Sequence, residues 1–271
     1  MIHFLGASAV GLFAGILSGL FGIGGALITT PALRLVMRAP ALIALGTTLP
    51  AVIPTALAGA VIYRKAGQLD SEVAFLVAPY GILGALGGAT ATAWASGSAL
   101  MLATAALVAA AAFWLLRNPS AAGVSSPEGH GPEPALPRSP VPWSPFGRRC
   151  LAIGLAAGGL SGLLGLGGGL ILVPAFVLLL HLPMRTALGT SLLAIVVLAV
   201  PGTVVHACLG HVDWVLAAGL AAGGAIAGCL GARLAIRATD AALRTAMSVF
   251  LLCVAAAYAA NEVVMMLSGQ R

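Results

Sequence analysis

The chain has 271 residues, of which 60% are hydrophobic and only 7% are charged. Soluble domains carry about 25% charged residues, so this composition excludes a water-soluble globular protein and indicates an integral membrane protein. The formal net charge of +6 does not indicate nucleic-acid binding, because the thirteen basic residues lie scattered at the ends of apolar segments.

The N-terminal part of the chain contains five apolar segments. A membrane-crossing helix needs about 20 mostly apolar residues, which makes the first two segments short for separate crossings. They either form a re-entrant hairpin, or one crosses the membrane and the other stops midway. The five segments cover about residues 4–20, 26–38, 41–63, 72–93 and 98–116.

A proline-rich stretch follows at residues 117–147. Its eight prolines exclude a helix and predict a linker between two domains, residues 1–116 and residues 148–271. We therefore predict an all-α, polytopic transmembrane bundle with about eight crossings, in contact with lipid in the inner (plasma) membrane of a bacterial-type cell. The apolar segments of the second domain cover about residues 150–163, 169–181, 184–206, 213–236 and 242–267.

The two domains repeat one sequence pattern. The twenty residues from Ala14 to Leu33 match those from Ala157 to Phe176 at thirteen positions, at an offset of 143 residues. Internal repeats are typical of membrane transporters, in which they are either parallel or inverted. The positions of the basic residues along the chain do not decide between these arrangements. The same offset pairs Gly46-Thr47-Thr48 with Gly189-Thr190-Ser191, Gly67 with Gly210 and Asp70 with Asp213.

Each repeat contains a glycine cluster that is expected to break a helix, since each glycine costs about 1 kcal/mol relative to alanine. In hydrocarbon, a broken helix leaves unpaired backbone groups unless protein or water surrounds them. Two such breaks indicate discontinuous helices whose second segments present free N–H groups to an anion. Close helix packing through small residues is the alternative. The glycines expected to bind the anion are Gly22, Gly24, Gly25, Gly165, Gly167 and Gly168.

A second candidate element follows each glycine cluster. The hydroxyl groups in Gly46-Thr47-Thr48 and Gly189-Thr190-Ser191 either donate to the anion or bond back to a carbonyl of their own helix. Pro31 and Pro174 are expected to start or kink the segment after each break. Asp70 and Asp213 each precede a span, and we expect them to cap its N-terminus or lie in its first turn. A role in proton coupling is the alternative.

Other function classes receive less support from the sequence. The chain has no ATP-binding motif, no cofactor-binding motif, and no catalytic triad or carboxylate pair, so we expect neither a cofactor nor an enzyme. His206, Cys208 and His211 have side chains that bind zinc or copper, which leaves a metal-ion permease as an alternative. A non-transporting scaffold or assembly protein is another alternative, and it would have an unbroken helix through residues 22–25.

The doubled glycine-rich block, with its downstream Gly-Thr/Ser pair, resembles the sulfite exporter TauE/SafE family, also called the toluene-sulfonate uptake permease family. The resemblance covers both repeats and nearly the whole chain outside the linker. Ala26 replaces a third glycine in the first copy, so the two half-sites are unequal. By this resemblance, the family's signature regions contain Gly22, Gly24, Gly25, Pro31, Gly46, Thr47, Thr48, Gly165, Gly167, Gly168, Pro174, Gly189, Thr190 and Ser191.

The resemblance implies a multi-span inner-membrane protein that moves a small sulfur-containing or organic anion. Together with the missing ATP motif, it leads us to expect a secondary transporter for an anion such as sulfite, sulfoacetate or another organosulfonate. We expect a small-molecule anion as its partner and no nucleic acid. The substrate-binding residues are then expected at the two glycine clusters and at the two Gly-Thr/Ser pairs.

Overall fold

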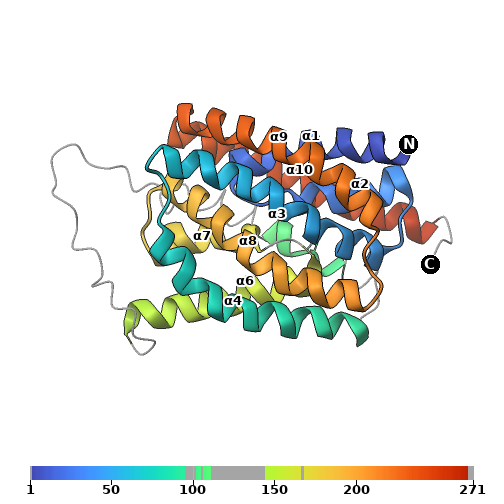
Figure 1. The fold of residues 1–271 in the computed structure, drawn as a ribbon, viewed down its shortest axis with the longest axis horizontal. Coiled ribbons are helices and arrows are strands. Elements are labelled where there is room, and N and C mark those ends of the chain that lie inside the picture. The colour runs from blue at the N-terminus through green and yellow to red at the C-terminus, as the bar shows by residue number, and fades with distance from the viewer. Residues whose placement is uncertain are drawn as a thin grey trace.

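The structure is a computed structural model, and it describes residues 2–94, 100, 102–104, 106–110, 144–165 and 168–267. Every regular element in these residues is helical, as the sequence predicts. Figure 1 shows the long helices side by side along one axis. They are α1 (Ile2–Phe21), α2 (Ala26–Met37), α3 (Ala41–Lys65), α4 (Ser71–Ala91), the short η1 (Thr92–Trp94), α6 (Pro145–Leu164), α7 (Gly169–Leu179), α8 (Met184–Cys208), α9 (Trp214–Arg237) and α10 (Asp240–Leu267).

Most of the predicted linker, residues 117–143, lies outside the described residues. The structure departs from the prediction at its end, because α6 already begins at Pro145. The Ser144 side chain accepts a hydrogen bond from the Gly147 N–H at 2.9 Å and caps the helix, and proline is favoured in a first helical turn. The second group of helices therefore starts three residues earlier than the sequence pattern indicates.

Five helices in the described part of the chain are long and apolar enough to cross a membrane. The predicted total of about eight crossings exceeds this number and stays a prediction. The first segment is longer than expected, because its apolar stretch extends over Phe4–Phe21 and meets the length for a crossing. The five helices are α1, α3, α4, α8 and α9.

The short helix α2 returns alongside α1. Near its start, a Cβ added to Gly25 would lie 3.4 Å from the Ala14 carbonyl oxygen and 3.4 Å from the Ser18 Cβ. Near its end, Met37 lies beside Gly6, at the other end of α1. The two helices are therefore antiparallel. Of the two arrangements left open by the sequence, the structure has a helix of crossing length followed by a short return.

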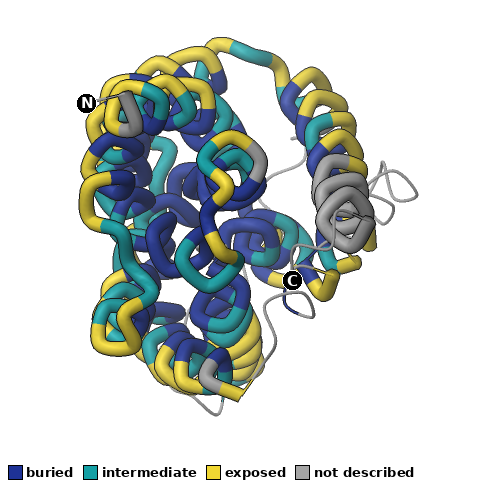
Figure 2. Tube along the Cα trace, turned by 90° about the vertical axis from the view of Figure 1, so that its right-hand side faces the viewer, coloured by how far each residue is buried: buried dark blue, intermediate teal, exposed yellow. Residues whose placement is uncertain are grey.

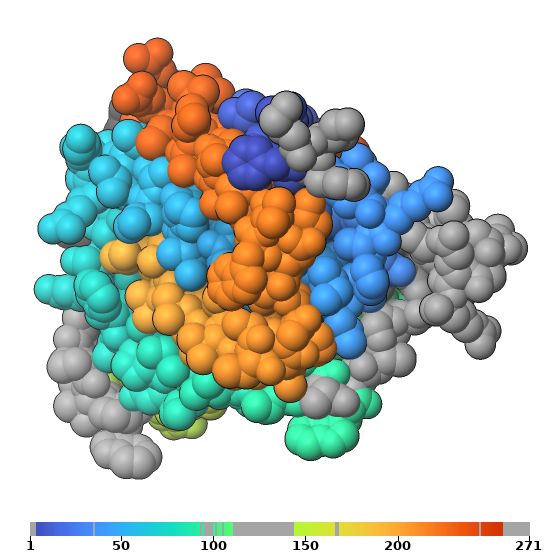
Figure 3. All heavy atoms as spheres, turned by 45° about the vertical axis from the view of Figure 1, so that its right-hand side comes forward, coloured from blue at the N-terminus to red at the C-terminus, as the bar shows by residue number. Residues whose placement is uncertain are grey.

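The helix α1 packs most closely against α9, although the two are far apart in sequence. Gly11, Gly15 and Gly19 of α1 approach Leu220, Gly224 and Gly228 of α9 in that order, so the helices run parallel. A Cβ on Gly15 would lie 2.5 Å from the Gly224 carbonyl oxygen, so the backbones touch because side chains are missing. Figure 3 shows α9, in orange, packed against blue residues near the N-terminus.

The helices α4 and α6 form a second interface of the same kind. Gly154, Gly158 and Gly162 of α6 approach Val77, Gly81 and Ala85 of α4, again in parallel order. A Cβ on Gly154 would lie 2.6 Å from the Val77 carbonyl oxygen. The first helix of the second half, α6, therefore packs on α4, the fourth helix of the first half, and α1, the first helix of the chain, packs on α9, the fourth described helix of the second half.

The helices α3 and α8 lie antiparallel between these two interfaces. The start of α3 meets the loop after α8, since the Asp213 N–H donates to Thr47 Oγ1 at 2.9 Å. The start of α8 meets the loop after α3, since the Asp70 N–H donates to Thr190 Oγ1 at 2.9 Å. We call the two ends of the bundle the Asp70 end (residues 64–72, 183–186 and 237–240) and the Asp213 end (residues 38–44 and 208–214).

The two aspartates cap helices, as predicted. The Asp70 Oδ1 accepts from the Val73 N–H at 3.1 Å and caps α4. The Asp213 Oδ1 accepts from the N–H groups of Val215 and Leu216 and caps α9. These caps fix where the chain turns at each end.

The distribution of burial fits a bundle that faces lipid. Viewed end-on in Figure 2, buried residues gather in the central helices and exposed residues follow the outer ones. Large apolar side chains such as Phe13, Phe75, Leu83 and Ile226 are exposed on α1, α4 and α9. A soluble monomer rarely exposes so much apolar surface, whereas a membrane helix presents it to lipid.

Candidate functional site

The first predicted glycine break is present between α1 and α2. The helix α1 ends at Phe21, and α2 begins five residues later at Ala26. Between them, Gly22, Gly24 and Gly25 have φ angles of 68°, 77° and 86°. Side chains with a Cβ rarely adopt these left-handed conformations, so the turn requires glycine. The scaffold alternative, which predicts an unbroken helix here, does not match the structure.

A second break separates α6 from α7. Gly165 and Gly168 have φ angles of 63° and 74°, and Gly168 is the residue that precedes α7. The predicted binding residue Gly167 lies outside the described residues, together with residue 166. At both breaks, a left-handed glycine directly precedes the second helix, whose first N–H groups have no acceptor within the helix.

The two breaks touch each other at the middle of the bundle. A Cβ on Gly169, the first residue of α7, would lie 2.5 Å from the Ile23 Cα in the first break. A Cβ on Gly24 would lie 3.0 Å from side-chain carbons of both Val52 and Ile195. Val52 and Ile195 each lie at the mid-length of a 25-residue helix, α3 or α8. The breaks therefore meet at the mid-length of α3 and α8, with apolar side chains packed around them.

The predicted hydroxyl residues Thr48 and Ser191 each reach across to a break in the other half of the chain. Thr48 Oγ1 donates to the Gly165 carbonyl at 3.2 Å and to the Leu45 carbonyl at 2.8 Å. Ser191 Oγ contacts the Gly22 carbonyl at 2.7 Å and the Leu188 carbonyl at 2.8 Å. Each hydroxyl has one proton to share. Each hydroxyl therefore bonds back to its own helix, which is one of the two outcomes considered from the sequence, and it also holds the opposite break, while donation to an anion stays a prediction.

The other members of the two Gly-Thr/Ser pairs contact loops at the ends of the bundle. Thr47 and Thr190 accept the loop N–H groups of Asp213 and Asp70. Gly46 and Gly189 lie so close to the carbonyl oxygens of His211 and Gln68 that a Cβ would clash. These residues join α3 and α8 to the loops instead of lining the space between the breaks.

Two carbonyls near the broken helix ends receive side-chain donors. The Tyr63 hydroxyl donates to the Gly19 carbonyl at 3.1 Å, and His206 Nε2 lies 3.0 Å from the Gly162 carbonyl. Because a carbonyl only accepts, His206 Nε2 must donate. In the neutral ring, its Nδ1 then accepts from the Nδ1–H of His211 at 3.2 Å. Burial lowers the pKa of His211, which favours its neutral form.

Replacing Tyr63 by phenylalanine is expected to destabilise the protein by about 1–3 kcal/mol, because the buried Gly19 carbonyl loses its donor. Thermal unfolding in detergent measures the change. Tyr80→Phe is the matched control, since no hydrogen bond of the half-buried Tyr80 hydroxyl is seen among the described residues. Equal melting temperatures for Tyr63→Phe and the wild-type protein would contradict the proposed capping role.

The metal alternative receives little structural support in the described residues. His206 and His211 touch, but Cys208 is exposed. No group of three or more His, Cys, Asp or Glu side chains comes together in the part of the chain that the structure describes. The histidines already use three of their four ring nitrogens in the contacts with Gly162 and with each other.

The prolines lie inside the second helices and not at their starts. Pro31 is the sixth residue of α2 and Pro174 is the sixth of α7. Proline has no N–H, so the carbonyls of Leu27 and Leu170 lose their usual helical bonds. Each short helix is therefore weakened near its middle, which is consistent with the predicted kink but not with a helix start.

Sequence reasoning did not select the buried serines beside the breaks. Ser18 is 0% exposed and Ser161 is 1% exposed, and neither hydroxyl has a partner among the described residues. The Ser18 Cβ lies next to Gly25, and the buried Thr30 hydroxyl of α2 also has no partner there. Both serines belong to the identical positions of the doubled block, so the signal was present. A cavity of about 10 Å³, enough for roughly one water, adjoins this break and is lined by Gly24, Gly25, Thr29 and Thr55 among others.

Comparison with known proteins agrees with this architecture. Residues 7–258 match the family model described as sulfite exporter TauE/SafE. The chain belongs to this family. A probable membrane transporter protein of Xylella fastidiosa (strain 9a5c) is 31% identical over 231 residues, which cover 84% of this chain and 83% of that protein. The TauE/SafE chain is thus a multi-pass membrane transporter of the cell membrane and not an enzyme.

Two Bacillus subtilis (strain 168) proteins are also similar to this TauE/SafE chain. The probable membrane transporter protein YunE is 28% identical over 239 residues, covering 82% of this chain and 85% of YunE. The probable membrane transporter protein YdhB is 27% identical over 208 residues, which cover 74% of this chain and 78% of YdhB. No solved structure matches the chain significantly.

Proposed function

We propose that this chain is a secondary transporter that carries a small anion, such as sulfite, sulfoacetate or another organosulfonate, past the two glycine breaks. The observation that carries the proposal is the contact between Gly169 and Ile23 at the mid-length of the bundle. This contact brings the start of α7 to the first break. Helix N-termini bind anions through free N–H groups and the positive end of the helix dipole, without a formal charge.

We further propose that residues 1–116 and 148–271 form two inverted repeats. Contacts that differ by the 143-residue offset support this arrangement. Gly15 against Gly224 corresponds to Gly158 against Gly81, and Tyr63 with Gly19 corresponds to His206 with Gly162. The corresponding helices α3 and α8 run in opposite directions. Inverted repeats with broken helices at mid-depth are a common architecture of secondary transporters.

The site in this conformation is closed to an anion. Ile23, Val52 and Ile195 surround the point where the breaks meet. The adjoining cavity of about 10 Å³ has room for roughly one water. Transport therefore requires the breaks to move apart. Ser18 and Ser161, which have no partner among the described residues, then supply hydroxyl donors to the anion together with the glycine N–H groups.

Anion flux into proteoliposomes that contain the purified chain tests this function. We expect concentration-dependent uptake of sulfite or sulfoacetate that competes with related sulfonates and stops when the ion gradient is dissipated. Empty liposomes are the control. Flux of a divalent metal ion but no anion would support a metal permease, and no flux of any solute would support a scaffold. Either outcome would overturn the proposal.

A further inference from the structure

A polar cavity opens at the Asp70 end of the bundle, away from the glycine breaks. Its volume is about 350 Å³, which lies within the range of pockets that hold small organic ligands. It lies where the starts of α8 and α10 face the loop after α3. The cavity is lined by Gln68, Pro183, Arg185, Thr186, Thr239 and Asp240.

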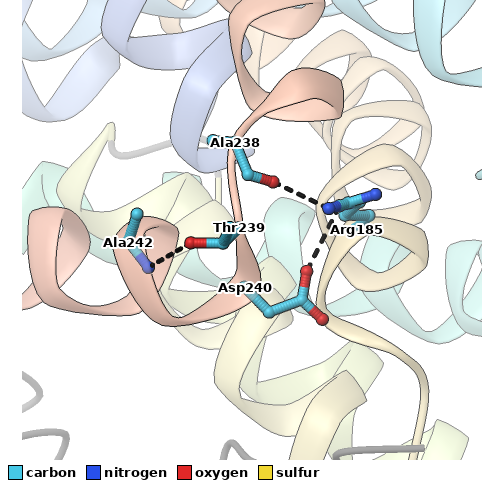
Figure 4. A network of polar contacts seen from close by, with 5 residues as sticks. All are labelled: Arg185, Ala238, Thr239, Asp240 and Ala242. Atoms are coloured by element: carbon cyan, nitrogen blue, oxygen red, sulfur yellow. Dashed lines mark hydrogen bonds and ion pairs between the residues drawn. The ribbon is translucent and has the colours of Figure 1, made fainter.

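Arg185 supplies the cation of this cavity, and Figure 4 shows it directed toward the start of α10. One terminal nitrogen donates to the Ala238 carbonyl at 2.7 Å, and Nε lies 3.2 Å from Asp240 Oδ1. The Arg185 and Asp240 side chains are 32% and 47% exposed. The Nε atom itself is buried and makes no hydrogen bond within the described residues, so the contact with Asp240 lacks hydrogen-bond geometry, and the partly exposed carboxylate is screened by solvent. An incoming anion can therefore replace the Asp240 carboxylate on the guanidinium, which has five N–H donors.

The other polar groups of the cavity complement an anion. Thr239 Oγ1 accepts a hydrogen bond from the Ala242 N–H at 3.3 Å, so its own hydroxyl proton remains available to donate. The buried Gln68 Oε1 has no partner among the described residues. Gln68 also lines the cavity, and its amide NH₂ group carries two donors and no charge that would repel an anion. Among the described residues that line the cavity, Asp240 has the one acidic side chain, and its carboxylate opposes anion binding.

The helix α8 begins at the cavity and runs past the glycine breaks. Arg185 lies in the first turn of this helix, and Ser191, which contacts the Gly22 carbonyl, follows six residues later. At 1.5 Å per residue, Ser191 is about 9 Å and Ile195 about 15 Å further along the helix axis. The helix α8 thus carries the Arg185 guanidinium in its first turn and the residues that contact the first break further along, toward its middle.

The distribution of basic residues indicates which side of the membrane the Asp70 end faces. Basic residues in transporter loops concentrate on the cytoplasmic side. At the Asp213 end, the described residues contribute only Arg34 and Arg38, both near the end of α2. Arg149 belongs to the Asp70 end, because its side chain donates to the Leu179 carbonyl at the end of α7. In the part of the chain that the structure describes, the basic residues at or near the Asp70 end are Arg64, Lys65, Arg148, Arg149, Arg185, Arg233, Arg237 and Arg244.

We propose that the cavity around Arg185 is a cytoplasmic vestibule, where a small sulfonate, carboxylate or sulfur oxyanion exchanges with Asp240 before it moves along α8 to the breaks. This inference rests on the proposed function. It adds a second anion site, at a position where the repeat has no cation, since Leu42 stands 143 residues before Arg185. The vestibule therefore makes the two ends of the protein chemically different.

The first test is sulfite uptake into inside-out membrane vesicles, in which the cytoplasmic end faces the medium. Arg185→Gln is expected to raise the KM for sulfite about tenfold with a maximal rate within about twofold of wild type, since the vestibule concentrates the anion but does not form the central site. Arg185→Lys is expected to recover part of this loss. Asp240→Asn is expected to lower the KM, because it removes the competing carboxylate. Arg233→Gln, an exposed cation nearby on α9, is the control and should leave the KM unchanged.

Two results would overturn the vestibule. An unchanged KM in Arg185→Gln would do so, and so would an increase in KM in Asp240→Asn as large as that in Arg185→Gln, which would indicate a purely structural ion pair. Normal sulfite uptake by the wild type in those experiments would leave the proposed function intact. A wild-type protein that carries no anion would overturn both proposals.

Labelling with a membrane-impermeant maleimide tests the orientation separately. Cys208 is exposed at the Asp213 end, and a variant that keeps only this cysteine should react in intact spheroplasts. A variant whose single cysteine is Lys65→Cys, at the Asp70 end, should react only after the cells are opened. The reverse pattern would show that the vestibule faces outward and would overturn the cytoplasmic assignment.

Discussion

Gly24→Ala is expected to lower anion flux by about tenfold or more while the protein still inserts into the membrane. The new Cβ would lie 3.0 Å from Val52 and Ile195, at the point where the two breaks meet. It would occupy space that the anion needs and would hold the breaks in their closed contact. A tenfold loss corresponds to about 1.4 kcal/mol. The left-handed φ of 77° also adds about 1–2 kcal/mol of backbone strain, which the control variant shares.

Gly67→Ala is the matched control for this experiment. Gly67 has nearly the same left-handed conformation, with a φ of 69°, but no atom lies within 4 Å of its added Cβ. Both variants therefore carry backbone strain, and only Gly24→Ala fills the meeting point. Flux and the amount of folded protein are measured for both in proteoliposomes. Equal flux in the two variants would argue against a site at the breaks.

Gly88→Ala is expected to destabilise the bundle by about 1–3 kcal/mol or more, the usual range for overpacking. An added Cβ would clash with the Gly159 carbonyl oxygen, so α4 and α6 would have to separate. Backbone atoms cannot move aside as a flexible side chain can. Thermal unfolding in detergent and the amount of protein in the membrane measure the effect.

The neighbouring residue Gly87 provides the control on the same helix. Nothing lies within 4 Å of its added Cβ, so Gly87→Ala is expected to leave stability unchanged or raise it slightly. Gly231→Ala is expected to behave like Gly88→Ala, because its Cβ would clash with the Ile16 carbonyl oxygen in the other interface. If Gly88→Ala were as stable as Gly87→Ala, the close packing of α4 on α6 would be wrong.

Much of this architecture can be predicted from the sequence, because some residues favour a single local structure or environment. A chain in which 7% of the residues are charged is expected to lie in a membrane. The left-handed turns at Gly22 and Gly165 need glycine. Asp70 and Asp213 stand directly before apolar segments, where a carboxylate satisfies the first N–H groups. In each case, local chemistry alone determines the outcome.

Helix partners and side-chain roles were not predictable from the same sequence. Glycines such as Gly15 permit close approach to any small-residue helix, so nothing in α1 alone selects α9. A hydroxyl such as that of Ser191 bonds an anion or a carbonyl equally well, and only the fold brings it to the Gly22 carbonyl. In the sequence, Arg185 is indistinguishable from any other charged residue at a segment end, because its partner Asp240 belongs to a different helix.

The packing of α1 on α9 has a consequence for biosynthesis. Leu220 of α9 is made long after Gly11 of α1, which it touches in the finished protein. A ribosome adding about 5–20 residues per second takes about 10–40 s to cover that interval. During this time the glycine-lined face of α1 lies in the membrane without α9 packed against it. In the same way, α4 is inserted before α6 has been synthesised. The nascent N-terminal half therefore depends on lipid or on insertion factors to cover these helix faces until the C-terminal half has been synthesised.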